Sequence, residues 1–186
     1  MRMANGGSWR ISEDMGWSLT VALYVRDRLG LADESGVPPL APAVASERGE
    51  QQWAEAWHAW FAGLVNAESP ARRDPLEQVR YPEFRAMVGS LLDEASEWAS
   101  QRKKEHIEEF MRRRRAYPLL VNRIVDGVAS TLGRKPVPFE LRITMLPVKG
   151  FWAHRAAGDH LLVSEKTRSD PDRFRDVLEP ILLEIA

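Results

Sequence analysis

The 186-residue chain contains no cysteine, no excess of either charge and no long apolar run. Without cysteine it can form neither disulfides nor thiolate metal sites, and it has no thiol nucleophile. Its formal net charge of -1 gives no overall attraction to nucleic acid or to an anionic membrane. Its longest uncharged stretches, 35–46 and 56–67, fall short of the roughly 20 apolar residues that cross a bilayer. We therefore expect a soluble protein without a membrane partner.

The start of the chain and the choice of basic residues indicate where the protein works. Residues 1–8 lack the apolar core of a secretory signal, and two acidic residues follow at 13 and 14. Arginine outnumbers lysine by 21 to 5, a usage that suggests a bacterium with a GC-rich genome. Together with the absence of cysteine, this predicts a bacterial protein of the cytoplasm.

Apolar spacing predicts helices in the first two-thirds of the chain. Residues 17–29 alternate like a strand but also repeat at helical spacing, and the following Gly30-Leu31, typical of a helix C-terminus, favours a helix. A second helix is predicted over 47–66. A long pattern from 83 to 115 thins between Gln101 and His106, so it is either one helix or two.

The periodicity changes to two after a fourth predicted helix, 120–132. Strands are predicted near 139–146, 150–155 and 159–164, and Asp170-Pro171 is typical of the start of a final helix. The sequence thus predicts an α+β fold: a helical part over about 15–133, then a small antiparallel or mixed sheet that the C-terminal helix covers, over about 137–186. We expect a single domain, 1–186.

Two histidines in the predicted hairpin are candidate metal ligands. If residues 156–158 form a three-residue loop with a positive φ at Gly158, then Arg155 pairs with Asp159 and His154 faces His160 across the strands. Such a pair could share a metal, with Glu184 as a third ligand, or one imidazole could act as a general base. A loop of two or four residues would put the histidines on opposite faces. Surface histidines without a role are the favoured interpretation.

An aromatic stripe marks the second predicted helix. It comprises Trp53, Trp57, Trp60 and Phe61. Such a stripe could anchor a partner, because tryptophan is frequent at binding hot spots. Core packing is the favoured interpretation, because an amphipathic helix must bury its apolar face.

Basic residues concentrate near the end of the long predicted helix. The formal charge is -6 over residues 1–97, +8 over 98–155 and -3 over 156–186. Arg112, Arg113, Arg114 and Arg115 could contact phosphates of a nucleic acid. However, four consecutive arginines spread around a helix, and pairs such as Glu108 with Arg112 and Glu109 with Arg113 are available. A solvated or internally paired helix face is therefore favoured.

A complete catalytic set, a cofactor motif and a nucleotide-binding loop are not recognisable in this sequence. We therefore expect a non-enzymatic interaction or regulatory module that uses the aromatic stripe or the long helix to bind a protein partner or itself, without a cofactor. Two alternatives are kept: a metal-dependent hydrolase centred on the two histidines, and nucleic-acid binding through residues 102–115.

Overall fold

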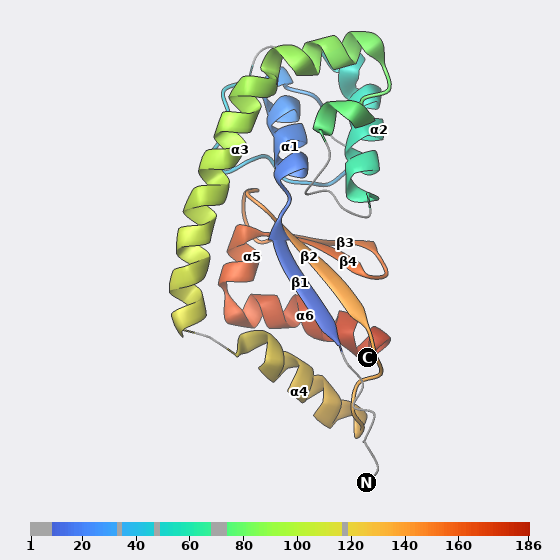
Figure 1. Cartoon of the computed structure of the whole chain (residues 1–186), viewed down its shortest axis with the longest axis vertical. Helices are drawn as coiled ribbons and strands as arrows, with labels where there is room; N and C mark the ends of the chain where they lie inside the picture. Colours follow the sequence, from blue (N-terminus) through green and yellow to red (C-terminus); the bar gives the residue numbers. More distant parts are fainter. Residues whose placement is uncertain (1–8, 33–34, 47–48, 68–73, 117–118) are drawn as a thin grey trace.

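The computed structural model describes residues 9–32, 35–46, 49–67, 74–116 and 119–186. It shows an α+β fold with a helical lobe above a four-stranded mixed sheet (Figure 1). This confirms the predicted fold class, while the expectation of a single domain stays a prediction. The helical elements are α1 (Trp17–Leu29), η1 (Gln51–Trp53), α2 (Ala54–Val65), η3 (Pro75–Gln78), α3 (Pro82–Ala116), α4 (Leu120–Leu132), α5 (Glu165–Ser169) and α6 (Pro171–Ile185). The strands are β1 (Arg10–Met15), β2 (Glu140–Leu146), β3 (Ala153–Ala157) and β4 (His160–Ser164).

The sheet has the strand order β1-β2-β4-β3. β1, β2 and β4 are parallel, and β3 lies antiparallel to β4 at the edge. β1 is absent from the strands expected above, because Ser12, Glu13 and Asp14 are three consecutive polar residues and hide the alternation. Glu13 lies on the apolar side of this strand, where Arg168 of α5 binds its carboxylate with two hydrogen bonds of 2.6 and 3.1 Å.

Helix α1 settles the ambiguity of residues 17–29 in favour of the helix. Every residue from Ser18 to Arg26 is buried, so no polar face marks the helical period. The helix ends at Gly30, which has a φ of 60°, and the Leu31 amide donates to the Arg26 carbonyl at 3.1 Å. This left-handed cap is the ending that the sequence predicted.

The aromatic stripe of α2 packs into the core of the helical lobe. Trp57, Trp60 and Phe61 are buried among residues of α1 and α3. The indole N–H of Trp57 donates to the Ala22 carbonyl at 2.7 Å, and that of Trp60 donates to the Pro75 carbonyl at 2.8 Å. Core packing is thus confirmed for these three residues, and their indole donors are satisfied inside the protein.

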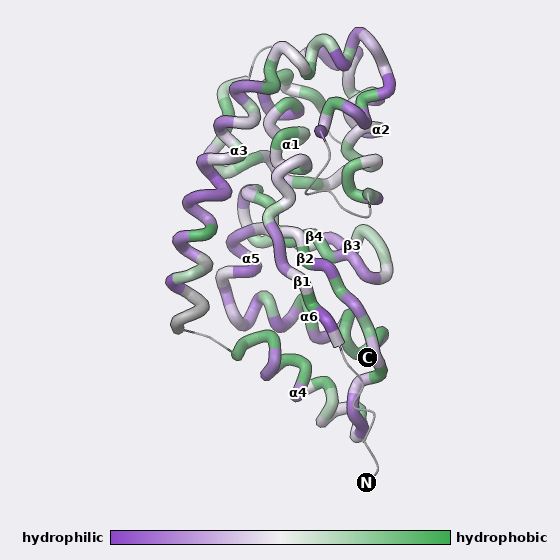
Figure 2. Tube along the Cα trace, in the orientation of Figure 1, coloured by the Kyte–Doolittle hydropathy of each residue, from purple (hydrophilic) through white to green (hydrophobic). Residues whose placement is uncertain are grey.

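The two faces of the sheet are covered differently. Helices α4 and α6 cover one face, and the helical lobe covers part of the other, where Leu146 and Leu162 are buried in the core cluster of that lobe. The apolar face of the sheet, with Leu141, Ile143 and Leu161, packs in one hydrophobic cluster with α4 and α6. Figure 2 shows hydrophobic stretches along α4 and a mainly hydrophilic second half of α3. The opposite face of β1 and β2 carries polar side chains, because residues with a period of two alternate between the faces.

Helix α3 is continuous over 35 residues, or about 52 Å. In Figure 1 its first turns cross the top of the helical lobe, and the rest of the helix runs down one flank of the molecule, past the sheet. Its first half buries Phe84, Val88, Ala95 and Ala99 in the core of that lobe. The polar stretch after Gln101 is therefore not a break between two helices.

We expect Arg168→Gln to lower the free energy of unfolding by about 2 kcal/mol, because it leaves the nearly buried Glu13 carboxylate without its bidentate partner. Arg175→Gln is the matched control, since Arg175 only reaches the exposed Asp172, and it should change stability by less than about 0.5 kcal/mol. Urea unfolding followed by circular dichroism measures both. Equal effects of the two changes would contradict this account of how β1 is held.

Candidate functional site

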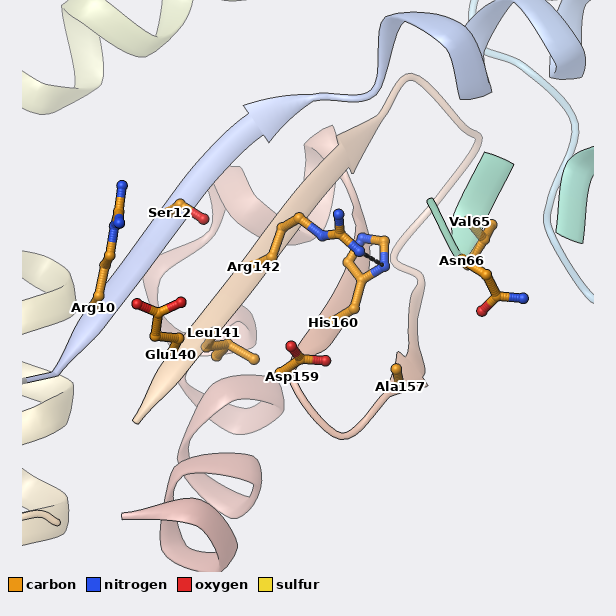
Figure 3. Close-up of a pocket in the computed structure, with 10 residues that line it drawn as sticks. All are labelled: Arg10, Ser12, Val65, Asn66, Glu140, Leu141, Arg142, Ala157, Asp159 and His160. Carbon is orange, nitrogen blue, oxygen red and sulfur yellow. Dashed lines mark hydrogen bonds between the residues drawn. The ribbon is translucent and has the colours of Figure 1, made fainter. Parts of the chain in front are cut away.

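A cavity of about 380 Å³ lies on the polar face of the sheet, under the C-terminal end of α2 (Figure 3). The cavity lies at the end of the sheet where the parallel strands β1, β2 and β4 begin. Its lining residues are Arg10, Ser12, Val65, Asn66, Glu140, Leu141, Arg142, Ala157, Asp159 and His160. Strand register explains why these residues meet. Ser12 pairs with Arg142, and Arg142 pairs with His160, so the three side chains form one row across the sheet.

Arg142 and His160 form the inner wall of this cavity. One guanidinium nitrogen of Arg142 donates to the Ala67 carbonyl at 2.9 Å, just after α2 ends. The other lies 3.0 Å from Nδ1 of His160. An arginine can only donate, so Nδ1 must be the acceptor and the ring proton is on Nε2. Arg142 therefore ties the end of α2 to the sheet and selects the tautomer of His160.

The network continues from His160 to Asp14 through Thr144. Nε2 of His160 lies 3.0 Å from the Thr144 hydroxyl, which is fully buried and accepts the imidazole proton. Thr144 pairs with Asp14 in the next row of the sheet and donates its own proton to the Asp14 carboxylate. Hydrogen bonds thus run in one direction, from Arg142 through His160 and Thr144 to Asp14.

The electrostatics of this network keep His160 neutral. Burial, and after it the adjacent Arg142 guanidinium, lower the pKa of His160 to about 4, against the opposing effects of the Val65 carbonyl and Asp159. Burial raises the pKa of Asp14 above its ordinary value, while the Thr144 hydrogen bond and the charges of Arg142 and Lys103 oppose the shift. With both ring nitrogens engaged, His160 has no lone pair directed at a substrate.

The expected pairing of the two histidines is wrong. His154 pairs with Leu162, and Ala157 pairs with His160, with a register shift between Arg155 and Ala157. The loop therefore holds two residues, Gly158 and Asp159, instead of the expected three, and Gly158 is not among the glycines with a positive φ. A two-residue loop alone would place the two histidines on opposite faces of the sheet. The bulge at the register shift reverses this effect, so both histidines lie on the polar face but do not pair with each other. His154 is exposed and stacks on Trp152 at 6.2 Å.

Glu184 does not join the histidines as a metal ligand. It forms an ion pair with Arg155, which pairs with Leu161 and therefore lies on the apolar face of the hairpin. His160 lies on the other face. In the part of the chain that the structure describes, no group of three or more histidine and carboxylate side chains is placed to hold a metal.

The other candidate residues lie away from the cavity. Trp53 is partly buried, and its indole N–H donates to Glu50 at 2.7 Å. Arg112 forms an ion pair with Glu109, three residues earlier, and not the i, i+4 pair with Glu108 that the sequence suggested. Arg113, Arg114 and Arg115 belong to α3, but their side chains lie outside the described part of the structure. Nucleic-acid binding by residues 102–115 stays a prediction.

Arg142, Thr144 and Asp14 are site residues that the sequence patterns did not single out. The alternation of 139–145 does identify Arg142 and Thr144 as the polar side of a strand. What it does not show is the parallel register that brings this side next to Asp14 and His160.

Comparison with protein-family models, with curated proteins and with solved structures finds no match to this chain. Within the described residues, no helix is both long and apolar enough to span a membrane. The function must therefore be argued from the cavity and its electrostatics.

We expect the free energy of unfolding to fall as the pH falls below about 6.5. In the unfolded chain His160 binds a proton near that pH, whereas in the folded protein it binds one only near pH 4. Between pH 7 and pH 4 this difference in the pKa of His160 lowers the free energy of unfolding by about 3 kcal/mol. The free energy of unfolding of His160→Gln should accordingly decline less over this range, by about that amount. Urea unfolding at a series of pH values measures the difference.

His154→Gln is the control for this measurement. Because His154 is exposed, we expect this variant to keep the pH dependence of the unchanged protein. The assignment of His160 as the neutral, buried histidine is contradicted if His160→Gln and His154→Gln alter the profile equally.

Proposed function

We propose that this protein is a non-enzymatic regulatory module that binds a small zwitterionic ligand, with both an ammonium and a carboxylate group, in the cavity under α2. The observation that carries the proposal is the lining itself. A cavity of about 380 Å³ is at the lower end of the range for small-molecule sites and has lining groups of both charges.

The two charges come from different strands. Arg10 of β1 is exposed and presents a planar guanidinium, the group best suited to a carboxylate. Glu140 of β2 and Asp159 beside β4 are exposed carboxylates that can accept hydrogen bonds from an ammonium group. Asn66, after α2, adds an amide at the opposite wall, as Figure 3 shows. This distribution favours a ligand with both charges over a simple anion or cation.

A binding role is better supported than catalysis. The one histidine in the cavity is neutral and uses both ring nitrogens in hydrogen bonds to Arg142 and Thr144. It is a rigid part of the cavity wall and not a proton acceptor. Rigid polar groups favour binding, because they lose little conformational entropy when a ligand binds. A ligand in this cavity would also touch both the sheet and the end of α2, so its binding would couple the two lobes.

The setting that we propose is the bacterial cytoplasm, on the strength of the arginine-rich composition and the absence of cysteine. Both features fit a regulatory protein that samples a small metabolite in a reducing compartment.

Thermal unfolding with free amino acids as probes tests this proposal. We expect at least one free amino acid to raise the Tm by about 5–10 °C at a concentration near 100 times its Kd. Its N-acetyl derivative lacks the ammonium charge and its methyl ester lacks the carboxylate charge, so both should give a much smaller shift. Arg10→Gln should abolish most of the shift, whereas the matched Arg175→Gln on α6 should preserve it. A shift that survives Arg10→Gln, or no shift with any of the twenty, would overturn the proposal.

A further inference from the structure

A second hollow lies in the helical lobe, between α1 and α3. It is an open groove of about 680 Å³, and the lining residues that matter here are Tyr24, Glu94, Glu97, Trp98, Gln101 and Lys104. Trp98 packs against Tyr24 with ring centroids 5.8 Å apart and forms an aromatic floor. The Tyr24 hydroxyl donates to Glu94 at 2.5 Å and so holds one of the two wall carboxylates in place.

This groove is suited to a partner that is both apolar and basic. Glu94 and Glu97 are exposed, and the side chain of Glu94 is 57% accessible. An aromatic floor beside exposed carboxylates can bury an apolar side chain and pair with a cation at the same time. The chain itself contains a helix with these properties.

That helix is the second half of α3, which continues directly below the groove. Ile107 and Met111 lie one turn apart and are 50% and 52% exposed. Lys103 and Lys104 are exposed on the preceding turn, whereas on the following turn Arg112 pairs with Glu109 and Glu108 is exposed. Contact with the sheet lobe comes from His106, whose Nδ1 lies 3.3 Å from a Glu165 carboxylate oxygen, on a different side of the helix from Ile107.

The exposed residues of α3 follow the spacing of a helix-pairing seam. Positions 97, 100, 104, 107 and 111 alternate in steps of three and four, and all five are exposed. The upper part of this seam is acidic and small, with Glu97 and Ser100. The lower part is basic and apolar, with Lys104, Ile107 and Met111. The two parts complement each other only when a second α3 runs in the opposite direction.

We infer that the chain forms an antiparallel homodimer through α3, in which the lower half of each α3 lies in the groove of the other copy. The two-fold axis then passes near residue 102. Ile107 of one copy packs on Trp98 of the other, Met111 lies about one turn further along the partner helix, and Lys104 of one copy is within reach of Glu97 of the other. Figure 1 shows α3 on the outer flank, where a second copy has access along the helix.

Sedimentation equilibrium of the full chain provides the first test. We expect a dimer at micromolar concentration whose dissociation constant rises with salt, because the contact includes opposite charges. Ile107→Glu should weaken the dimer at least tenfold. Val137→Glu, at a position that is 48% exposed elsewhere on the surface, is the matched control and should leave the dissociation constant unchanged. A monomer at all concentrations, with the circular dichroism of a folded protein, would overturn the inference.

Charge exchange tests the orientation of the two helices. Glu97→Lys and Lys104→Glu should each weaken the dimer, and the double variant should recover most of the affinity, since the pair forms between copies. In one copy these residues lie seven apart, two turns along the helix, where a direct ion pair is not formed. Lack of recovery in a folded double variant would contradict the antiparallel pairing.

The absence of cysteine allows a clean cross-linking test. Gln101→Cys lies beside the proposed two-fold axis and should form an intermolecular disulfide with its own copy under mild oxidation. Ser90→Cys lies on the same helix but far from the axis, and it should stay monomeric on a non-reducing gel. Cross-linking at both positions would indicate a parallel arrangement, and cross-linking at Ser90→Cys alone would place the contact elsewhere; either result overturns the proposal.

Discussion

A partly buried guanidinium must find acceptors for its enclosed donors, and in this protein that requirement organises the region between the lobes. Arg142 extends from the second strand of the sheet and meets the Ala67 carbonyl just beyond α2 on one side and the imidazole of His160 on the other. Carbonyl groups at a helix C-terminus carry partial negative charge, so the end of α2 is a favourable neighbour for a cation. The tautomer of His160, the role of Thr144 and the position of the cavity all depend on this one side chain.

The unequal covering of the sheet is the second constraint. Helices α4 and α6 cover the apolar face, and the helical lobe covers part of the opposite face, where polar side chains range from the exposed Ser12 to the fully buried Thr144. Where α2 ends over that face, polar groups become partly enclosed, and burial begins to change their pKa values. The cavity thus lies at a boundary, with the exposed Arg10, Glu140 and Asp159 toward solvent and the buried His160 at its inner wall.

Local patterns predicted those parts of the fold in which the chain itself carries the signal. The cap at Gly30, the stripe of α2 and the Asp170-Pro171 start of α6 depend on neighbouring residues, and the structure contains all three. The site could not be predicted in this way, because Asp14 and Thr144 meet through a pairing between distant strands. The expected pairing of His154 with His160 was wrong for a related reason: one bulged residue in the hairpin decides which side chains are opposite, and no composition rule specifies it.

The parallel pairing of β1 with β2 also determines the order in which this protein can be assembled. Two adjacent strands of one sheet are separated in the chain by everything from Gly16 to Phe139, so the whole helical lobe is their crossover connection. During synthesis β1 leaves the ribosome before β2, and it stays unpaired until α1 to α4 and then β2 have been made. The unpaired strand is short, and its run of Ser12, Glu13 and Asp14 makes it polar. The residues that hide β1 from sequence patterns thus also protect it from pairing with the wrong strand.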